Sequence, residues 1–309
     1  MKETKRIIYP ILLILAAMIW GFAFSAQKSA DETPPLLLGT LRSVFAAVFL
    51  FFAIVIRDKI KGEKSTLFKK NPFSKYEIAG GVICGVTLAA SNLFQQLGLN
   101  AGTDAGKASF ITALYVLFVP IYALAIGKRP RMNAVISMLI ALVGFYFLCI
   151  TEQTTLAPSD LLVLAAALIF PIYILAIDKY SDRADALKIS LIQFIVSALT
   201  SFIPSLFFEF PVPVGSVSQN ILYIIILGVG SSGIAYTLQI IGQRGVPPTA
   251  SSVLLSLESV FGVIGAMIFL GEGMSLREYI GSVILFLAVI ISQIDISIPT
   301  PKKAEGKEN

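Results

Sequence analysis

Residues 127–145 read GKRPRMNAVISMLIALVGF. Basic side chains are followed at once by an apolar run in which Asn133 and Ser137 are the only polar side chains. When the chain is shifted against itself by 144 residues, GEGMSLREYIGSVILFLAV (271–289) lies over this stretch, and Gly127 meets an identical residue. The stretch therefore combines the two features that predict the fold, which are apolar runs bounded by charged loops and an internal repeat.

Lipid is the expected solvent for most of the chain. Of its 309 residues, 56% are hydrophobic and 14% are charged, with a mean hydropathy of +0.83, whereas a soluble domain has roughly 25% charged residues. There is no histidine, and the two cysteines, Cys84 and Cys149, lie in apolar stretches. A histidine-based triad, a zinc cluster and a disulfide framework are thereby excluded, and we expect neither metal nor cofactor. The basic residues lie in loops rather than in a patch, so the pI near 9.1 does not indicate nucleic-acid binding.

Apolar runs long enough to cross a bilayer recur along the chain. A spanning helix needs about 20 mostly apolar residues. The first run follows MKETKR and is longer than the apolar region of a signal peptide, so we expect it to be retained as a membrane helix. Ten spans are predicted, at 7–27, 35–56, 77–99, 104–126, 132–150, 159–177, 186–208, 219–241, 248–270 and 276–296. The eighth contains LGVGSSGIAY and is the least regular.

The charges of the loops predict the orientation. With ten spans, most bases fall on one side, in MKETKR, in residues 57–75, in GKRPR, in 178–188, at Arg244 and in the tail. The other side carries only Lys28, Lys107 and Arg277 as bases, together with most of the acids between spans. The positive-inside rule therefore predicts a multi-pass protein of the cell membrane with both termini in the cytoplasm.

The repeat noted above extends over both halves of the chain. At a shift of 144 residues, Gln95 meets Gln239 and Gly98 meets Gly242 without a gap from about residue 80 to 148. For the first spans the shift is 150, and the long loop at 57–75 absorbs the difference. We expect an all-α membrane protein with two five-helix repeats, residues 1–151 and 152–296, followed by a tail at 297–309. Because five is odd, the second repeat is inverted, which is an architecture of alternating-access carriers. The alternative is an ancient duplication in a protein that does something else.

Several stretches resemble the drug/metabolite transporter superfamily of the EamA type. They are AAMIWGFAFSAQK (16–28), the intramembrane Arg42, LYVLFVPIYALAIGKRP (114–130) and LLSLESVFGVIGAMIFLGEGMSLREYIGSVILF (254–286). The chain departs from that pattern at Ser259, where the family often has proline, and in GEG (271–273), where it usually has Gly-Glu-Arg. The resemblance covers nearly the whole chain. It implies ten helices, a central cavity between the two halves and transport of small metabolites, often outward.

Two ionisable residues lie well inside predicted spans, where such groups are costly and are by default functional hypotheses. Glu258 lies near the middle of the ninth span, and Arg42 lies nearer the outer end of the second. Glu258 could face a wet cavity, pair with a cation, or be a protonated group bonded to a carbonyl or a serine. Arg42 could also snorkel towards the interface. We expect both residues to contact substrate.

Polar and aromatic residues complete the predicted site. Two stripes, containing Asn92 and Gln95 in the third span and Tyr236 and Gln239 in the eighth, are too polar to face lipid and could serve either a cavity or interhelical hydrogen bonds. Gln95 and Gln239 fall near opposite ends of their spans, which suits gates on opposite sides of one site. The aromatic candidates near mid-depth can line an amphipathic pocket or simply pack in the core; they are Trp20, Tyr115 and Tyr173.

These features predict a secondary active transporter of a small polar or zwitterionic metabolite, such as an amino acid, with export as the expected direction and protons as one candidate coupling ion. No Walker motif is present to couple ATP. A membrane-embedded enzyme is one alternative, but neither a nucleophile–base set nor clustered acids support it. A passive channel for small solutes is the other alternative, which would be expected to show rings of polar residues from identical subunits.

Overall fold

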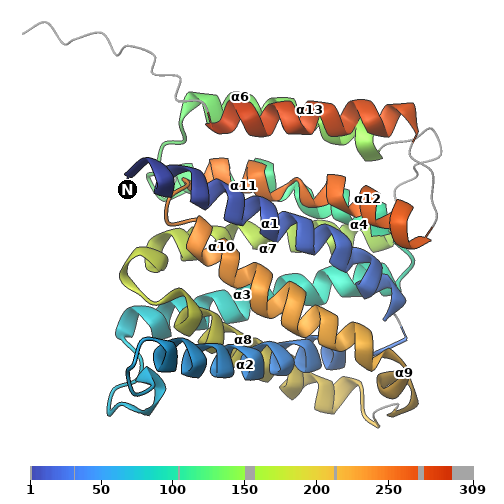
Figure 1. The fold of residues 1–309 in the computed structure, drawn as a ribbon. Helices are drawn as coiled ribbons and strands as arrows, with labels where there is room; N and C mark the ends of the chain where they lie inside the picture. The colour runs from blue at the N-terminus through green and yellow to red at the C-terminus, as the bar shows by residue number, and fades with distance from the viewer. Residues whose placement is uncertain are drawn as a thin grey trace, which may run out of the picture.

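The computed structural model describes residues 2–30, 32–103, 105–149, 157–211, 214–270 and 275–293, and these are almost entirely helical (Figure 1). The first part of the chain forms α1 (Lys2–Ser29), α2 (Pro35–Ile60), α3 (Lys75–Asn100), α4 (Ala105–Ala113), α5 (Tyr115–Ala125) and α6 (Met132–Cys149). The second part forms α7 (Pro158–Tyr180), α8 (Ala186–Phe208), α9 (Val214–Ile225), η3 (Ile226–Ala235), α10 (Tyr236–Gly242), α11 (Pro248–Leu255), α12 (Glu258–Leu270) and α13 (Leu276–Gln293). Short 3-10 turns, η1 (Thr66–Phe68) and η2 (Ser181–Arg183), lie in loops.

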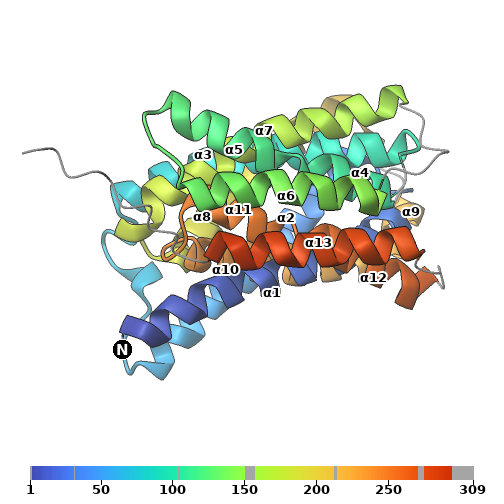
Figure 2. The same ribbon diagram turned by 90° about the horizontal axis from the view of Figure 1, so that it is seen from above.

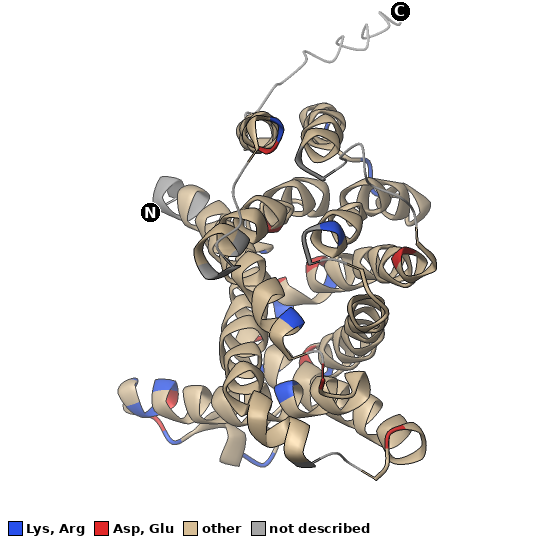
Figure 3. Cartoon of the chain, turned by 90° about the vertical axis from the view of Figure 1, so that its right-hand side faces the viewer, with Lys and Arg blue, Asp and Glu red and all other residues tan. Residues whose placement is uncertain are grey.

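The helices form a multi-pass membrane bundle. Within the described residues, nine helical segments are long and apolar enough to cross a membrane, and the shorter apolar segment Met132–Phe147 occupies the predicted fifth span. The axes run in roughly one direction, so the loops gather at two ends (Figures 1 and 2). Viewed along the axes, charged residues are sparse among the helices (Figure 3). Large apolar side chains such as Phe52 and Leu199 are exposed on the outside, as expected where the surrounding solvent is lipid.

One end of the bundle, at the left of Figure 1, carries most of the described loop bases, and we call it the basic end; the opposite end is the far end. The loops of the basic end are residues 61–74, 126–131, 181–185 and 243–247. Their bases are Lys61, Lys64, Lys69, Lys70, Lys128, Arg129, Arg131, Arg183 and Arg244.

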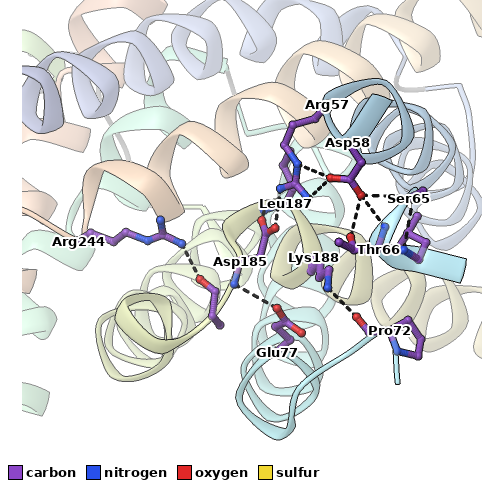
Figure 4. Close-up of polar contacts among 12 residues, drawn as sticks. Arg57, Asp58, Ser65, Thr66, Pro72, Glu77, Asp185, Leu187, Lys188 and Arg244 are labelled. Carbon is purple, nitrogen blue, oxygen red and sulfur yellow. Dashed lines mark hydrogen bonds and ion pairs between the residues drawn. The ribbon is translucent and has the colours of Figure 1, made fainter. Parts of the chain in front are cut away.

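Polar contacts hold the basic end together (Figure 4). Arg57, near the end of α2, forms ion pairs with Asp58 at 2.9 Å and with Asp185 at 2.5 Å. Asp58 also accepts hydrogen bonds from the backbone N–H and the hydroxyl of Thr66, and Glu77 accepts one from the backbone N–H of Asp185. These contacts fasten the long loop and the starts of α3 and α8 to the end of α2.

Equivalent helices of the two halves make similar packing contacts. α2 packs on α8, α6 on α13, α3 on α7, and α1 on η3 and α10. In the contact of α3 with α7, a Cβ on Gly98 would lie 2.4 Å from Val163 and 3.0 Å from the carbonyl oxygen of Ser159. In the contact of α10 with α1, a Cβ on Gly242 would lie 2.8 Å from Leu13 and 2.9 Å from the carbonyl oxygen of Tyr9. The two glycines are 144 residues apart, and their partners are 150 residues apart.

Two predicted continuous spans are broken. The span at 104–126 divides into α4 and α5 at Leu114, and the span at 248–270 divides into α11 and α12 at 256–257. Pro120 has no N–H and its ring crowds the preceding turn, which weakens the helix close to the first break. At the second break, the Ser256 hydroxyl bonds to the carbonyl of Val253, and such back-bonding bends helices.

The predicted eighth span is irregular in the structure as well. It runs from α9 through η3 to α10, and η3 is a π-helix rather than an α-helix. The small residues of LGVGSSG allow close packing here, since a Cβ on Gly228 would lie 2.9 Å from the carbonyl oxygen of Arg42 on α2. π-helical turns occur frequently at functional sites, and this one borders the cavity described next.

Candidate functional site

A small cavity lies in the middle of the bundle, with a volume of about 30 Å³. This is room for one or two water-sized groups. Eight of the nine residues predicted for the site line it, namely Trp20, Arg42, Asn92, Gln95, Tyr115, Tyr236, Gln239 and Glu258. The wall also includes Gln27, Thr112, Phe170 and Ser231, which the sequence analysis did not select. Gln27 is next to Lys28 at the end of the first span, so sequence position alone suggested an interfacial residue.

Arg42 faces inward and is held by η3. Its side chain is 5% exposed. Nε donates to the hydroxyl of Ser232 at 3.0 Å, and Nη2 donates to the hydroxyl of Ser231 at 3.1 Å. Arg42 therefore does not snorkel to an interface. A guanidinium carries five N–H donors, so these two bonds leave donors for a further partner.

Aromatic rings form one side of the cavity. Trp20 Nε1 donates to the backbone oxygen of Ser231 at 3.1 Å, and its ring lies 4.6 Å from that of Tyr236 between centroids. Tyr173 lies behind this wall rather than on it. It is fully buried, donates its hydroxyl proton to Gln193 and packs edge-on against Tyr236. Tyr173 thus orients a cavity residue and does not face the cavity itself.

Glu258 and Tyr115 stand at the two helix breaks. Glu258 is the first residue of α12 and Tyr115 is the first residue of α5, and both are almost fully buried. The two side chains are close enough to interact. Nevertheless, neither Glu258 Oε1 nor Tyr115 Oη has a well-formed hydrogen bond within the described protein. No ion pair joins Glu258 to Arg42 among the described residues either.

On the far-end side, amide side chains close the cavity. Gln95 Nε2 donates to the Thr112 hydroxyl at 2.9 Å, and Gln95 Oε1 accepts from Gln27 Nε2 at 3.4 Å. Both ends of the Gln95 amide are therefore used in contacts that join α3 to α4 and α1.

On the basic-end side, a second amide pair separates the cavity from a large vestibule. Gln239 Nε2 donates to Gln243 Oε1 at 3.0 Å, and Gln243 Nε2 donates to the backbone oxygen of Ile174 at 3.2 Å. Gln239 lines the cavity, whereas Gln243 lines the vestibule, whose volume is about 920 Å³. The vestibule lies between the basic-end loops and the ends of α1, α6 and α13, and an ion pair between Lys128 and Asp178 lies on its wall.

The cavity wall carries groups that can recognise a small molecule. Within the described residues, no group of three or more His, Cys, Asp or Glu side chains could hold a metal ion. Arg42 offers donors, Glu258 offers acceptors, and the aromatic rings of the same wall offer apolar faces. A helical membrane bundle with such a cavity, and with a vestibule leading towards it, has the features of a small-molecule transporter.

Comparison with known proteins places this transporter in a family. The model of the EamA-like transporter family matches residues 7–150 and 157–293, and the chain belongs to that family. An uncharacterized transporter of Archaeoglobus fulgidus is 29% identical over 96% of this chain and 89% of its own. An uncharacterized transporter of Methanothermobacter thermautotrophicus is 23% identical over 91% of this chain and 84% of its own. The uncharacterized transporter YwfM of Bacillus subtilis is 23% identical over 93% of this chain and 94% of its own. A solved structure described as "Crystal structure of protein" shares the fold, with a TM-score of 0.72 and 22% identity over 92% of this chain and 96% of that one.

Proposed function

We propose that the chain is a secondary active transporter that moves a small polar or zwitterionic metabolite, such as an amino acid, by alternating access. One observation carries the proposal: a buried guanidinium and a buried carboxylate line one cavity without pairing with each other. A buried charge without a partner costs several kcal/mol. The cavity would have to widen to admit a whole metabolite. A zwitterion bound between Arg42 and Glu258 would then satisfy both charges, and the rings of Trp20 and Tyr236 would contact its apolar part.

Alternating access accounts for the position of the cavity. Amide contacts lie on both sides of it, and the hydrogen-bonded pair Gln239–Gln243 connects its wall to the wall of the vestibule. The packing of Gly98 and Gly242 supports the inverted repeat, because both glycines and both sets of partners are related by the shifts of 144 and 150 residues that the sequence alignment requires. The two segments matched by the family model, 7–150 and 157–293, nearly coincide with the proposed repeats 1–151 and 152–296.

Orientation follows from the loop charges. Because the basic end carries most of the loop bases, the positive-inside rule assigns it, and both termini, to the cytoplasm. The vestibule would then receive metabolite from the cytoplasm, which suits export across the cell membrane. Glu258 offers a site for a coupling proton, since a carboxylate that loses and regains its substrate can exchange a proton in between.

Counterflow tests the proposal. A thermal-shift screen of the purified protein against metabolites identifies a stabilising ligand, because binding to the native state raises apparent stability. Proteoliposomes loaded with that ligand should then take up the labelled ligand faster than empty ones, and the uptake should saturate. Uptake that rises linearly and ignores the internal ligand would indicate a channel. A pH gradient that leaves the rate unchanged would exclude proton coupling.

A further inference from the structure

Three residues of the cavity wall each carry a buried oxygen that makes no well-formed hydrogen bond within the described protein, and each of these oxygens can accept one. They are Glu258 Oε1, Gln239 Oε1 and Tyr115 Oη. Leaving a buried acceptor unpartnered costs about 1–3 kcal/mol. Unpartnered atoms gathered on one cavity wall therefore indicate the kind of group that belongs there, which is one that donates hydrogen bonds.

The surrounding backbone fixes Gln239 as an acceptor. The oxygen of Ile174 can only accept, so Gln243 must present its Nε2 to it. Gln243 then presents Oε1 to Gln239, which must donate from its own Nε2. The remaining Oε1 of Gln239 is thus left without a partner, and turning the amide over would break this chain of bonds.

From this geometry we infer that Glu258, Gln239 and Tyr115 form a subsite for a primary ammonium group. An ammonium group of a substrate carries three N–H donors and one positive charge, which match three acceptors of which one is a carboxylate. Tyr115 can accept from the ammonium while its own proton points to Glu258. The cavity volume of about 30 Å³ suits a group of water size. The inference rests on the proposed function and names which end of the substrate lies on the Glu258 side.

The proposed subsite distinguishes ligands by the number of methyl groups on their ammonium nitrogen. The nearby rings of Trp20 and Tyr236 would attract any organic cation through their π faces. A trimethylated ammonium has no N–H, so it would leave the three acceptors without a donor. Substrates therefore belong to the class of primary amines and α-amino acids, and quaternary ammonium compounds are excluded.

Gln95, which the repeat pairs with Gln239, has a different set of hydrogen bonds. Gln95 uses Nε2 to reach Thr112 and Oε1 to accept from Gln27, and it leaves no orphaned atom. The two repeat-related amides thus differ despite the related sequences, because Gln239 keeps an unpartnered acceptor whereas Gln95 does not.

The single tryptophan of the chain allows a direct test. Trp20 lies on the cavity wall, so its fluorescence in the purified full-length protein reports on the site. n-Propylammonium should change the emission saturably, whereas N,N,N-trimethylpropylammonium and propionate should bind at least about tenfold more weakly, because charge-assisted hydrogen bonds are lost. Absence of a saturable response to n-propylammonium, or equal affinity for the trimethylated compound, overturns the inference.

Single substitutions test which residues form the ammonium subsite. Glu258→Gln should weaken n-propylammonium binding by at least about tenfold, and Tyr115→Phe by a few fold, whereas Gln96→Leu should leave it unchanged. Gln96 is a matched control, because it is buried and donates to Asn100 four residues on, as Gln239 does to Gln243, but it does not line the cavity. Unchanged binding in Tyr115→Phe and Glu258→Gln together would refute the subsite.

The two proposals fail separately. Saturable counterflow of a metabolite without n-propylammonium binding would leave the carrier intact and reject the ammonium subsite. Binding of n-propylammonium without counterflow of any stabilising metabolite would support the subsite and reject the transport mechanism.

Discussion

The amide pair between cavity and vestibule should control access from the basic end. Gln243→Ala removes the side chain that stands between the two spaces and breaks its bond to the oxygen of Ile174. A hydrogen bond between membrane helices is worth about 0.6–1.5 kcal/mol. Gln239 Nε2 also loses its acceptor, which adds a cost of similar size. The closed arrangement should therefore lose about 1.5 kcal/mol, or about tenfold in population.

Thiol labelling measures this shift. A single reporter cysteine, Asn92→Cys, is placed on the cavity wall in a background without the native Cys84 and Cys149. Where opening is fast, labelling by a polar impermeant reagent follows the open population. We expect Gln243→Ala to raise the labelling rate from the basic end about tenfold and to leave labelling from the far end no faster.

The control and the refuting result follow from the same contacts. Gln96→Ala removes another buried amide bonded four residues along its helix but distant from the vestibule, and it should not change the rate. If Gln243→Ala keeps the thermal stability of the parent protein and labels at the same rate from the basic end, then the amide pair does not close the cavity.

Three further outcomes are expected. A reporter fused after Asn309 should be active only in the cytoplasm, because most loop bases lie at the end of the bundle where α13 finishes; activity outside would reverse the orientation. Glu258→Gln should raise the substrate concentration for half-maximal transport by at least about tenfold, since in the proposed site it removes the charge that would face the substrate cation; wild-type transport in this variant, with misfolding of Glu258→Leu, would make the carboxylate structural. Glu209 accepts hydrogen bonds from the backbone N–H groups of Leu36 (2.8 Å) and Leu37 (2.7 Å) at the start of α2. Glu209→Ala should therefore lower the free energy of unfolding by about 1–2 kcal/mol and the melting temperature by several degrees. The control is Glu32→Ala at an exposed position, and equal melting temperatures for the two variants would show that Glu209 is not a cap.

The sequence by itself determined the class of protein and half of the residues of the cavity wall. Long apolar runs can only be solvated by lipid, and a polar side chain within such a run must turn towards protein or water. That is why the stripes containing Gln95 and Gln239 could be assigned to the interior before any contact was known. Helical periodicity was sufficient here, because it fixes which residues share a face.

Tertiary structure decided the partners. Arg42 is bound by serines about 190 residues away, and Tyr173 lies behind the cavity wall although it is as deep and as aromatic as Trp20. The break before Glu258 and the π-helical turn of η3 also depend on neighbouring helices, which satisfy or crowd the backbone where it leaves the α-helix. Periodicity specifies the face of a helix, but the residue that meets that face is set by the packing of distant segments. Only the folded chain therefore shows which partners a buried polar side chain has.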